Sequence, residues 1–262
     1  MSAAIGGGAL PPLAPYAGLA GRYDRLVGDA GFPLLWRGFL AACERYRIAP
    51  ASVADIGCGT GRVLAALTRR LPPGTPLLGV DRSPAMLAVA RRRLVGTGVR
   101  LLRQDLRRLA LPRRFDLLTC NFDTLNYLTR VEDLQLAIDS FARCMVFDGH
   151  LIFDILRGDS KVPPPSIQGH ALWLPGLRGR WSAQPSAGGG GSVVVVDACE
   201  SQEGGGPSRC WRETHRQRWW SLPLVRRLLE AAGLALLGVH RVGGPARAGP
   251  SDRWVQLVAR RR

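Results

Sequence analysis

Apolar residues along the chain gather in seven short runs, and amphipathic stretches separate most of them. Each run is five to nine residues long, as is usual for a strand, whereas three of the intervening stretches place apolar residues at helical spacing. The runs cover residues 52–57, 77–81, 99–103, 115–120, 150–155, 234–242 and 254–259, and the helical stretches cover 62–71, 83–94 and 131–147. Because strands alternate with helices, the pattern predicts an α/β fold in which a mostly parallel, doubly wound, seven-stranded sheet carries helices on both faces.

The alternation stops after the fifth run. Residues 157–220 are rich in Gly and Pro, contain a flexible Gly tract at 187–192, and hold strand-like runs at 171–174, 193–198 and 210–217. They predict a small antiparallel insertion, with Gly204-Gly205-Gly206 as one hairpin turn. A helical pattern resumes at 222–232 and ends at Gly233, a residue type that commonly terminates helices.

Four regions follow from this organisation. Residues 1–50 form a flexible leader and an N-terminal helical cap, in which 23–26 and 36–40 carry aromatic anchors. Residues 51–156 form a ligand-binding core, 157–220 form the insertion, and 221–262 add the last helix and two strands. The uncharged stretch 1–21 lacks a basic segment and contains Gly6-Gly7-Gly8 and Pro11-Pro12, so a disordered leader is favoured over a secretory signal.

The segment 53–61, Val-Ala-Asp-Ile-Gly-Cys-Gly-Thr-Gly, joins the first strand to the first helix. Glycines at such a turn let a ligand approach the backbone N–H groups at the start of the helix. A dinucleotide fingerprint, G-x-G-x-x-G/A, would require a small residue where Arg62 stands. The spacing is instead D-x-G-x-G-x-G, so a dinucleotide is not favoured.

Three successive strand ends each supply an acid: Asp55, Asp81 and Asp105. The motif and these acids resemble the class I S-adenosylmethionine (SAM) dependent methyltransferases, from about Tyr16 to the C-terminus. SAM carries a net positive charge, which suits acids at the strand tips better than a pyrophosphate would. The resemblance implies a Rossmann-like core, SAM as cofactor and S-adenosylhomocysteine (SAH) as product.

The resemblance also implies roles for individual residues. The glycine loop would hold the methionine moiety, Asp81 the ribose hydroxyls, and Asp105 with Leu106 the adenine. An N-terminal tyrosine, Tyr16 or Tyr23, would lie near the methionine carboxylate, although both aromatic residues would equally serve the packing of the cap. The expected cofactor-binding residues are Tyr16, Tyr23, Asp55, Gly57, Cys58, Gly59, Gly61, Asp81, Arg82, Met86, Gln104, Asp105, Leu106, Asn121 and Phe122.

Two further segments resemble a bacterial small-molecule branch of these enzymes, in which an antiparallel lid follows the fifth strand. Residues 121–128, Asn-Phe-Asp-Thr-Leu-Asn-Tyr-Leu, resemble its F-D-S-L-N-Y-L segment, and residues 213–221 resemble its E-x-H-x-Q-R-aromatic motif. Ligands of open α/β sheets bind beyond the carboxyl ends of the strands, where the 121–128 loop begins. The expected acceptor-binding residues are Asp123, Asn126, Tyr127, Trp173, Arg218 and Trp219.

His215, Glu213 and Tyr127 are the candidate catalytic residues. Methyl transfer needs alignment above all, and it needs a base only where the nucleophile carries a proton of high pKa. Histidine is the side chain that ordinarily titrates near neutrality, and His215 lies on an expected lid strand. Glu213, His215 and Gln217 would equally form a polar network on one strand face. No grouping of His, Asp and Glu has metal-ligand spacing, so no metal site is expected.

The formal net charge is +16, and nine arginines fall between residues 91 and 114. Clustered cations bind phosphates, but 35 of the 36 basic residues are Arg, as a biased codon composition would produce. The chain also lacks the [N/D/S]-P-P-[Y/F/W] turn with which base-methylating enzymes clamp an exocyclic amine. A small-molecule acceptor, in natural-product biosynthesis among other routes, is therefore favoured over nucleic acid.

Cysteine spacing and hydropathy bear on the compartment and on membrane association. Six cysteines form no C-x-x-C pair, which favours a reducing cytoplasm. No run of about 20 apolar residues predicts a membrane span. A monomer or homodimer is expected. An RNA or protein methyltransferase and a noncatalytic SAM-binding protein remain alternatives, and the acceptor nucleophile, O, N or C, stays open.

Overall fold

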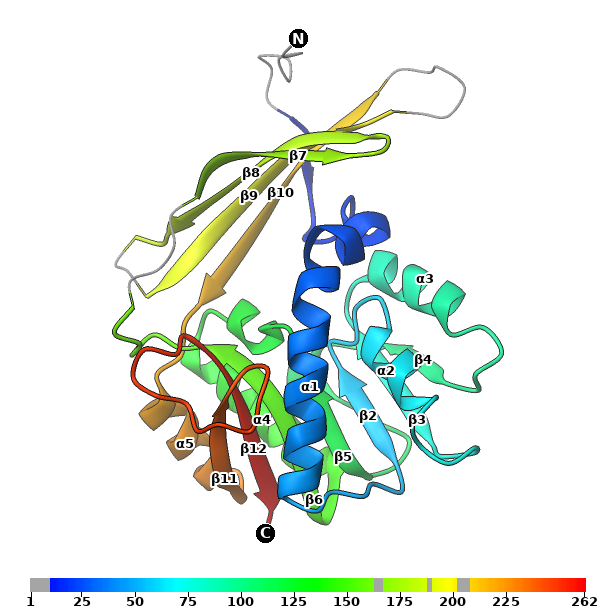
Figure 1. The fold of residues 1–262 in the computed structure, drawn as a ribbon, viewed down its shortest axis with the longest axis vertical. Helices are drawn as coiled ribbons and strands as arrows, with labels where there is room; N and C mark the ends of the chain where they lie inside the picture. Colours follow the sequence, from blue (N-terminus) through cyan, green and yellow to red (C-terminus); the bar gives the residue numbers. More distant parts are fainter. Residues whose placement is uncertain (1–9, 163–166, 188–189, 202–207) are drawn as a thin grey trace.

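The structure is a computed structural model that describes residues 10–162, 167–187, 190–201 and 208–262. Two sheets dominate it: a seven-stranded sheet in the lower part of Figure 1 and a five-stranded sheet above it. The larger sheet has the strand order β11-β12-β6-β5-β2-β3-β4, in which β2 to β6 are parallel and β12 is antiparallel to both of its neighbours, β6 and β11. The predicted doubly wound, seven-stranded, mostly parallel sheet is thus confirmed.

The strands of the larger sheet match the seven apolar runs closely. They are β2 (Val53–Ile56), β3 (Leu77–Asp81), β4 (Arg100–Arg103), β5 (Phe115–Cys120), β6 (Met145–Leu156), β11 (Leu234–Arg241) and β12 (Trp254–Arg261). One boundary differs, because the helix expected over 131–147 ends at Cys144 and β6 begins at once. Met145 pairs with Phe115 of β5, so sheet pairing overrides the local helical pattern there.

Five α-helices cover the two faces of the larger sheet. One face carries α1 (Asp29–Arg45), α2 (Arg62–Leu67) and α3 (Pro84–Arg93), and the other carries α4 (Val131–Cys144) and α5 (Leu222–Ala231). Neighbouring strand residues alternate between the two apolar cores: Leu117 packs toward α1 and α2, and Leu118 packs toward α4. Short helical turns lie at η1 (Ala20–Arg22), η2 (Asp24–Gly28), η3 (Leu106–Arg108) and η4 (Thr124–Tyr127).

The smaller sheet, which we call the lid sheet, has the order β1-β10-β9-β8-β7. Its strands are β1 (Pro12–Leu13), β7 (Ile167–Leu174), β8 (Leu177–Pro185), β9 (Gly191–Glu200) and β10 (Arg209–Arg218). The insertion after the fifth core strand is therefore antiparallel, as predicted. Strand β8 was not predicted, because its sequence contains Arg, Gly and Gln and few apolar residues. The Gly204-Gly205-Gly206 turn lies outside the described residues.

A disulfide joins Cys199 of β9 to Cys210 of β10, which are directly opposed in the strand register. The spacing of the six cysteines gave no sign of this pair, because only strand pairing brings the two residues together. Cys43, Cys58, Cys120 and Cys144 are free thiols.

The N-terminal region differs from the predicted leader. From residue 10 onward it is ordered: β1 adds a parallel strand to β10, and η1 follows. The flexible leader is thus wrong for residues 10–21, and residues 1–9 lie outside the described part of the chain. Apolar contacts explain the difference, because Leu13 and Leu19 pack in the core of the lid sheet with Trp211.

Candidate active site

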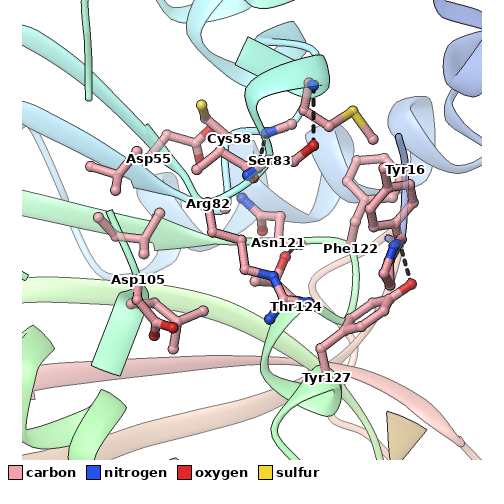
Figure 2. A pocket seen from close by; sticks show the side chains of 18 of the residues that line it. Tyr16, Asp55, Cys58, Arg82, Ser83, Asp105, Asn121, Phe122, Thr124 and Tyr127 are labelled. Carbon is pink, nitrogen blue, oxygen red and sulfur yellow. Dashed lines mark hydrogen bonds between the residues drawn. The ribbon is translucent and has the colours of Figure 1, made fainter. Parts of the chain in front are cut away.

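A pocket opens where β2, β3 and β5 end and the loops toward the helices begin (Figure 2). Residues 57–60 of the glycine turn form one wall, and Tyr16 and Tyr23 of the N-terminal segment close the pocket from the lid side. The pocket brings together fourteen of the fifteen residues expected to bind cofactor, namely Tyr16, Tyr23, Asp55, Gly57, Cys58, Gly59, Asp81, Arg82, Met86, Gln104, Asp105, Leu106, Asn121 and Phe122.

The three loop glycines are required by their backbone conformations. Gly57, Gly59 and Gly61 have φ values of +71°, +53° and +80°, a region that other residues rarely adopt. A Cβ at Gly57 would lie 2.6 Å from the side chain of Thr124, which begins η4. Gly61 does not line the pocket, because it precedes α2 and faces Ala90 of α3 and Leu94, the C-cap of that helix. Its role in the structure is close helix packing rather than ligand approach.

Asp81 ends β3 and organises the loops on both sides of it. One carboxylate oxygen accepts the N–H of Gly59 at 2.9 Å, and the other accepts the N–H of Ser83 at 2.8 Å. Burial raises the pKa of this carboxyl, and the two backbone donors oppose that rise. Ser83 caps α3 by accepting the N–H of Met86 at 3.3 Å.

Asp55 is fully buried beneath the glycine loop, and Thr119 of β5 donates a hydrogen bond to it at 2.6 Å. Burial raises the pKa of Asp55 to about 7, while the Thr119 hydroxyl acts in the opposite direction. A cation bound in the pocket would favour the ionised carboxylate. Asp55 therefore fits a positively charged ligand.

Asp105 begins η3, and its carboxylate is held by Arg107. The Nε and Nη2 atoms of Arg107 donate to it at 2.9 and 2.7 Å, and the guanidinium also pairs with Asp133. Arg107 holds the pKa of Asp105 below its usual range. Gln104 bonds both polar groups of its side chain to the backbone of Ala110. Both residues thus line the pocket while their side chains also fix the loop after β4.

The residues present fit SAM. Glycines with positive φ line the pocket with backbone at positions 57 and 59, and the carboxylates of Asp55 and Asp81, both shifted by burial, match a cationic ligand. The Oδ1 atom of Asn121, which is buried on the pocket wall, has no hydrogen-bond partner among the described residues. An acceptor left unpaired in this way costs free energy unless a ligand supplies a donor.

On the lid side, three candidate residues form a continuous polar chain that begins in the pocket. The hydroxyls of Tyr16 and Tyr127 are hydrogen-bonded (Figure 2), and Tyr127 Oη lies 3.0 Å from Nδ1 of His215. The other ring nitrogen, Nε2, lies 3.3 Å from Oε2 of Glu213. Burial raises the pKa of both tyrosines above the ordinary value, so they are neutral phenols. His215 and Glu213 lie behind the pocket wall and reach it through Tyr127 and Tyr16.

Asp123 lies just behind Tyr127, in a turn where Phe122 and Asp123 both have positive φ. Its N–H donates to Asp154 of β6 at 2.8 Å, and Gln217 of β10 donates to its carboxylate. Burial, with the charge of Asp154 adding to it, raises the pKa of Asp123 to about 8. The Asp123 carboxylate therefore links the loop to the lid and is not part of the pocket wall.

Besides Asp123, four more predicted acceptor-binding residues lie outside the pocket. Asn126 is fully buried and clamps backbone groups of Leu156 and Arg218. Arg218 donates to Thr129 O, and its guanidinium stacks on Trp220. Trp219 packs under Arg253. Trp173 is 65% exposed on β7, the strand of the lid sheet farthest from β1. These side chains join the lid to the core or face outward, which the sequence pattern did not distinguish from facing a ligand.

Sequence reasoning missed a second contact between the N-terminal region and the glycine loop. Asp24 accepts a hydrogen bond from Thr60 Oγ1 at 2.8 Å and pairs with Arg93 of α3. Arg93 in turn donates to the carbonyl of Thr60 at 2.7 Å. The only available signal was an acid next to Tyr23 in the predicted cap, and the acid and its partners are 36 and 69 residues apart.

Comparisons with known proteins agree with this geometry. The family model for a methyltransferase domain matches residues 53–149. The dTDP-3-amino-3,6-dideoxy-alpha-D-glucopyranose N,N-dimethyltransferase of Streptomyces fradiae is 28% identical over 80% of the chain and 79% of its own length. Three other curated methyltransferases match over shorter stretches. The chain spans 55 to 65% of their own lengths.

Solved structures show the same fold over nearly the whole chain. An S-adenosylmethionine-dependent methyltransferase from Clostridium acetobutylicum superposes with a TM-score of 0.77 at 19% identity, covering 94% of this chain and 98% of that one. The sugar N-methyltransferase KedS8 from a Streptoalloteichus species gives 0.72 at 23% identity, covering 100% and 98%. Residues 53–149 therefore match a methyltransferase domain, and nearly the whole chain has the fold of SAM-dependent methyltransferases, with SAM as the cofactor.

Two observations bear on other kinds of site. No helix among the described residues has both the length and the apolar character needed to cross a membrane. Within the described ranges, no three His, Cys, Asp or Glu side chains are grouped so that they would hold a metal ion.

Proposed function

We propose that the protein methylates the amino group of a small-molecule acceptor of the amino-sugar class. The observation that carries the proposal is the polar chain Tyr16–Tyr127–His215–Glu213, which leads from the pocket into the buried side of the lid sheet. The Streptomyces relative and the Streptoalloteichus structure, both sugar N-methyltransferases by name, support this acceptor class.

SAM supplies an electrophilic methyl group, and Asp55, Asp81 and the 57–61 turn are the residues that would hold it. An aliphatic amine is largely protonated at neutral pH and lacks the lone pair needed for attack, so it must first lose a proton. An alcohol has a much higher pKa than an ammonium group, so the same tyrosine–histidine chain removes a proton from an ammonium more readily.

The polar chain provides a route for that proton. With Nε2 protonated toward Glu213, Nδ1 of His215 is an acceptor at 3.0 Å from Tyr127 Oη. The acceptor ammonium would give its proton to the Tyr127 oxygen while the Tyr127 proton moves to Nδ1. The resulting imidazolium is stabilised by the Glu213 carboxylate, whereas the phenol returns to its neutral form.

The surroundings of Tyr127 also suit an amine. Tyr16 and Tyr23 meet edge to face with ring centroids 5.5 Å apart, and Phe122 lies 6.4 Å from Tyr23. Aromatic faces attract ammonium groups, including methylated ones. A product that keeps its charge after one methylation would remain bound favourably, which suits transfer of a second methyl group.

A paired acceptor screen tests the proposal. A nucleotide-linked amino sugar and its hydroxyl counterpart are each incubated with SAM, and SAH release and product mass are measured. We expect addition of one or two methyl groups to the amine and none to the alcohol. Methylation of the hydroxyl compound alone would overturn the choice of nitrogen. Methylation only of RNA or protein, with a steep loss of activity in salt, would overturn the acceptor class.

A further inference from the structure

The N-terminal segment 10–22 belongs structurally to the lid sheet, although it covers the cofactor pocket. Strand β1 pairs in parallel with β10 through Pro12 opposite Arg212 and Leu13 opposite Glu213. The carbonyl of Pro11 accepts the N–H of Arg212 at 3.0 Å. In Figure 1 this segment descends from the lid sheet and leads into α1, so it connects the two sheets.

One buried carboxylate holds the segment in place. Glu213 is fully buried, and its oxygens accept three backbone N–H groups: Tyr16 at 2.7 Å, Gly18 at 2.5 Å and Leu19 at 3.0 Å. A buried carboxylate is costly unless it is hydrogen-bonded, and three aligned backbone donors satisfy it. Tyr16 has a φ of +66°, which turns successive N–H groups toward the same anion.

Close packing adds to this anchor. Gly18 lies against the indole ring of Trp211 on β10, and a Cβ at Gly18 would overlap that ring. Leu19 is buried in the lid core with Leu177 and Val196. The segment is therefore fixed to the lid by its backbone and its side chains alike.

The same segment forms part of the cofactor pocket. Tyr16 and Tyr23 line it, and Asp24 binds Thr60 of the glycine loop. Eleven residues thus lie between the β1 pairing at Pro12 and the loop contact at Asp24, and Glu213 holds the segment to the lid between these two points.

We infer that Glu213 is a positioning residue that makes the cofactor cover and the acceptor lid one unit. Cofactor in the pocket orders Tyr16 and Tyr23, and Glu213 transmits that order to β10, which carries His215. Cofactor binding and lid closure are then coupled, and the coupling is reciprocal: whatever steadies the lid also tightens cofactor binding. This goes beyond the proposed acceptor class and rests only on cofactor binding.

Hydrogen exchange with SAH as the probe tests the inference. Three proteins are compared with and without SAH: wild type, Glu213→Gln and Asp197→Asn. Among the described residues, the side chain of Asp197 on β9 bonds Arg212 of the lid, at 2.6 Å and 2.8 Å, so Asp197→Asn is a matched control. We expect SAH to slow exchange in both the glycine loop and β9–β10 of wild type and control. In Glu213→Gln, SAH should protect the glycine loop alone and bind about tenfold more weakly.

Lid protection by SAH that persists in Glu213→Gln would overturn the inference, because a merely structural carboxylate would leave the ligand-induced change intact. If Glu213→Gln fails to fold, Gly18→Ala makes the same test, since it displaces the segment from Trp211 and keeps Glu213 with His215. Protection of both regions in Gly18→Ala would likewise overturn it. Failure of wild type to bind SAH at all would instead contradict the cofactor assignment.

Discussion

The cofactor side of the pocket and its lid side are built in opposite ways. On the cofactor side, residues within the single segment 53–61 and the strand ends at Asp81 and Asp105 supply the wall. On the lid side, the key contacts join residues very far apart: Tyr16 and Glu213 are 197 positions apart, and Tyr127 and His215 are 88. Local motifs can therefore form a cofactor site, whereas the contacts on the lid side form only when the lid sheet is placed against the loops of the larger sheet.

This difference also separates two kinds of chemistry. The cofactor side presents buried acids and glycines that suit a cation, whereas the lid side presents neutral phenols, an imidazole and a carboxylate that suit proton movement. Substitutions on each side test whether the two sides are separate in function as well as in construction.

The largest effect is expected on the lid side, at His215. As a base acting through Tyr127, His215→Ala should lower turnover of the amine acceptor about 10² to 10⁴-fold, with SAH binding intact and the acidic limb of the pH–rate profile lost. If His215 only positions the acceptor, the acceptor KM should rise while the pH profile persists. Steady-state kinetics across pH separates the two outcomes.

Arg216→Ala provides the control, because Arg216 is the exposed neighbour on the opposite face of β10. A His215→Ala protein that matches wild type in turnover, acceptor KM and pH dependence would exclude both roles. The chemistry would then rest on proximity alone.

The next effect belongs to the cofactor side. Asp81→Ala removes a charged acceptor from the pocket wall and releases the N–H groups of Gly59 and Ser83. We expect a loss of about 1.5 to 3 kcal/mol in SAH binding, which is about 10- to 150-fold in Kd. Calorimetric titration measures it. Glu132→Ala, which removes an equal charge from the exposed surface of α4, should leave Kd unchanged, and an unchanged Kd for Asp81→Ala would remove the site assignment.

These two sites also show what the sequence can and cannot predict. The glycine turn, Asp55, Asp81 and the seven core strands were predictable, because strand, turn and helix follow one another in the chain and each motif carries its own structure. The catalytic candidates on the lid were predictable as residue types, since Glu213, His215 and Gln217 alternate on one strand. Their contacts with Tyr16, Tyr127 and Asp123 were not, because they depend on strand register and sheet stacking.

The same reason explains the failures. Asn126, Arg218 and Trp219 belong to motifs that border the pocket in sequence, but their side chains face the joint between lid and core. Segment 10–22 resembles a disordered leader in its sequence, because the β10 residues with which it pairs lie about 200 positions later in the chain. A composition rich in Gly, Ala and Pro does not predict a two-residue strand. Strand β1 forms because it pairs with β10, which is distant in the sequence.

An intermediate effect is expected from pH, through Asp55. Its ordinary pKa of 3.8 is raised to about 7 by burial, so the carboxyl is largely protonated below pH 7 in the free protein. A cationic ligand binds the ionised form better, hence SAM affinity should fall as pH drops below 7, by up to about tenfold per pH unit, and should level off above it. Asp55→Asn should bind SAM weakly at every pH. A wild-type affinity that is flat between pH 5.5 and 7.5 would contradict the coupling.

The smallest effect is expected at the outer edge of the lid, and it tests how far the lid side extends. Trp173 is largely exposed on β7, and the guanidinium of Arg178 stacks on its ring at 5.4 Å. Trp173 does not line the pocket, so Trp173→Ala should alter acceptor KM less than about twofold. An exposed substitution of this kind should also change the free energy of unfolding by less than about 0.5 kcal/mol. Tyr127→Phe, at the pocket end of the polar chain, should in contrast impair turnover. If Trp173→Ala instead raised KM tenfold with turnover unchanged, β7 would have to approach the acceptor during the reaction, and the acceptor site would include the whole width of the lid sheet.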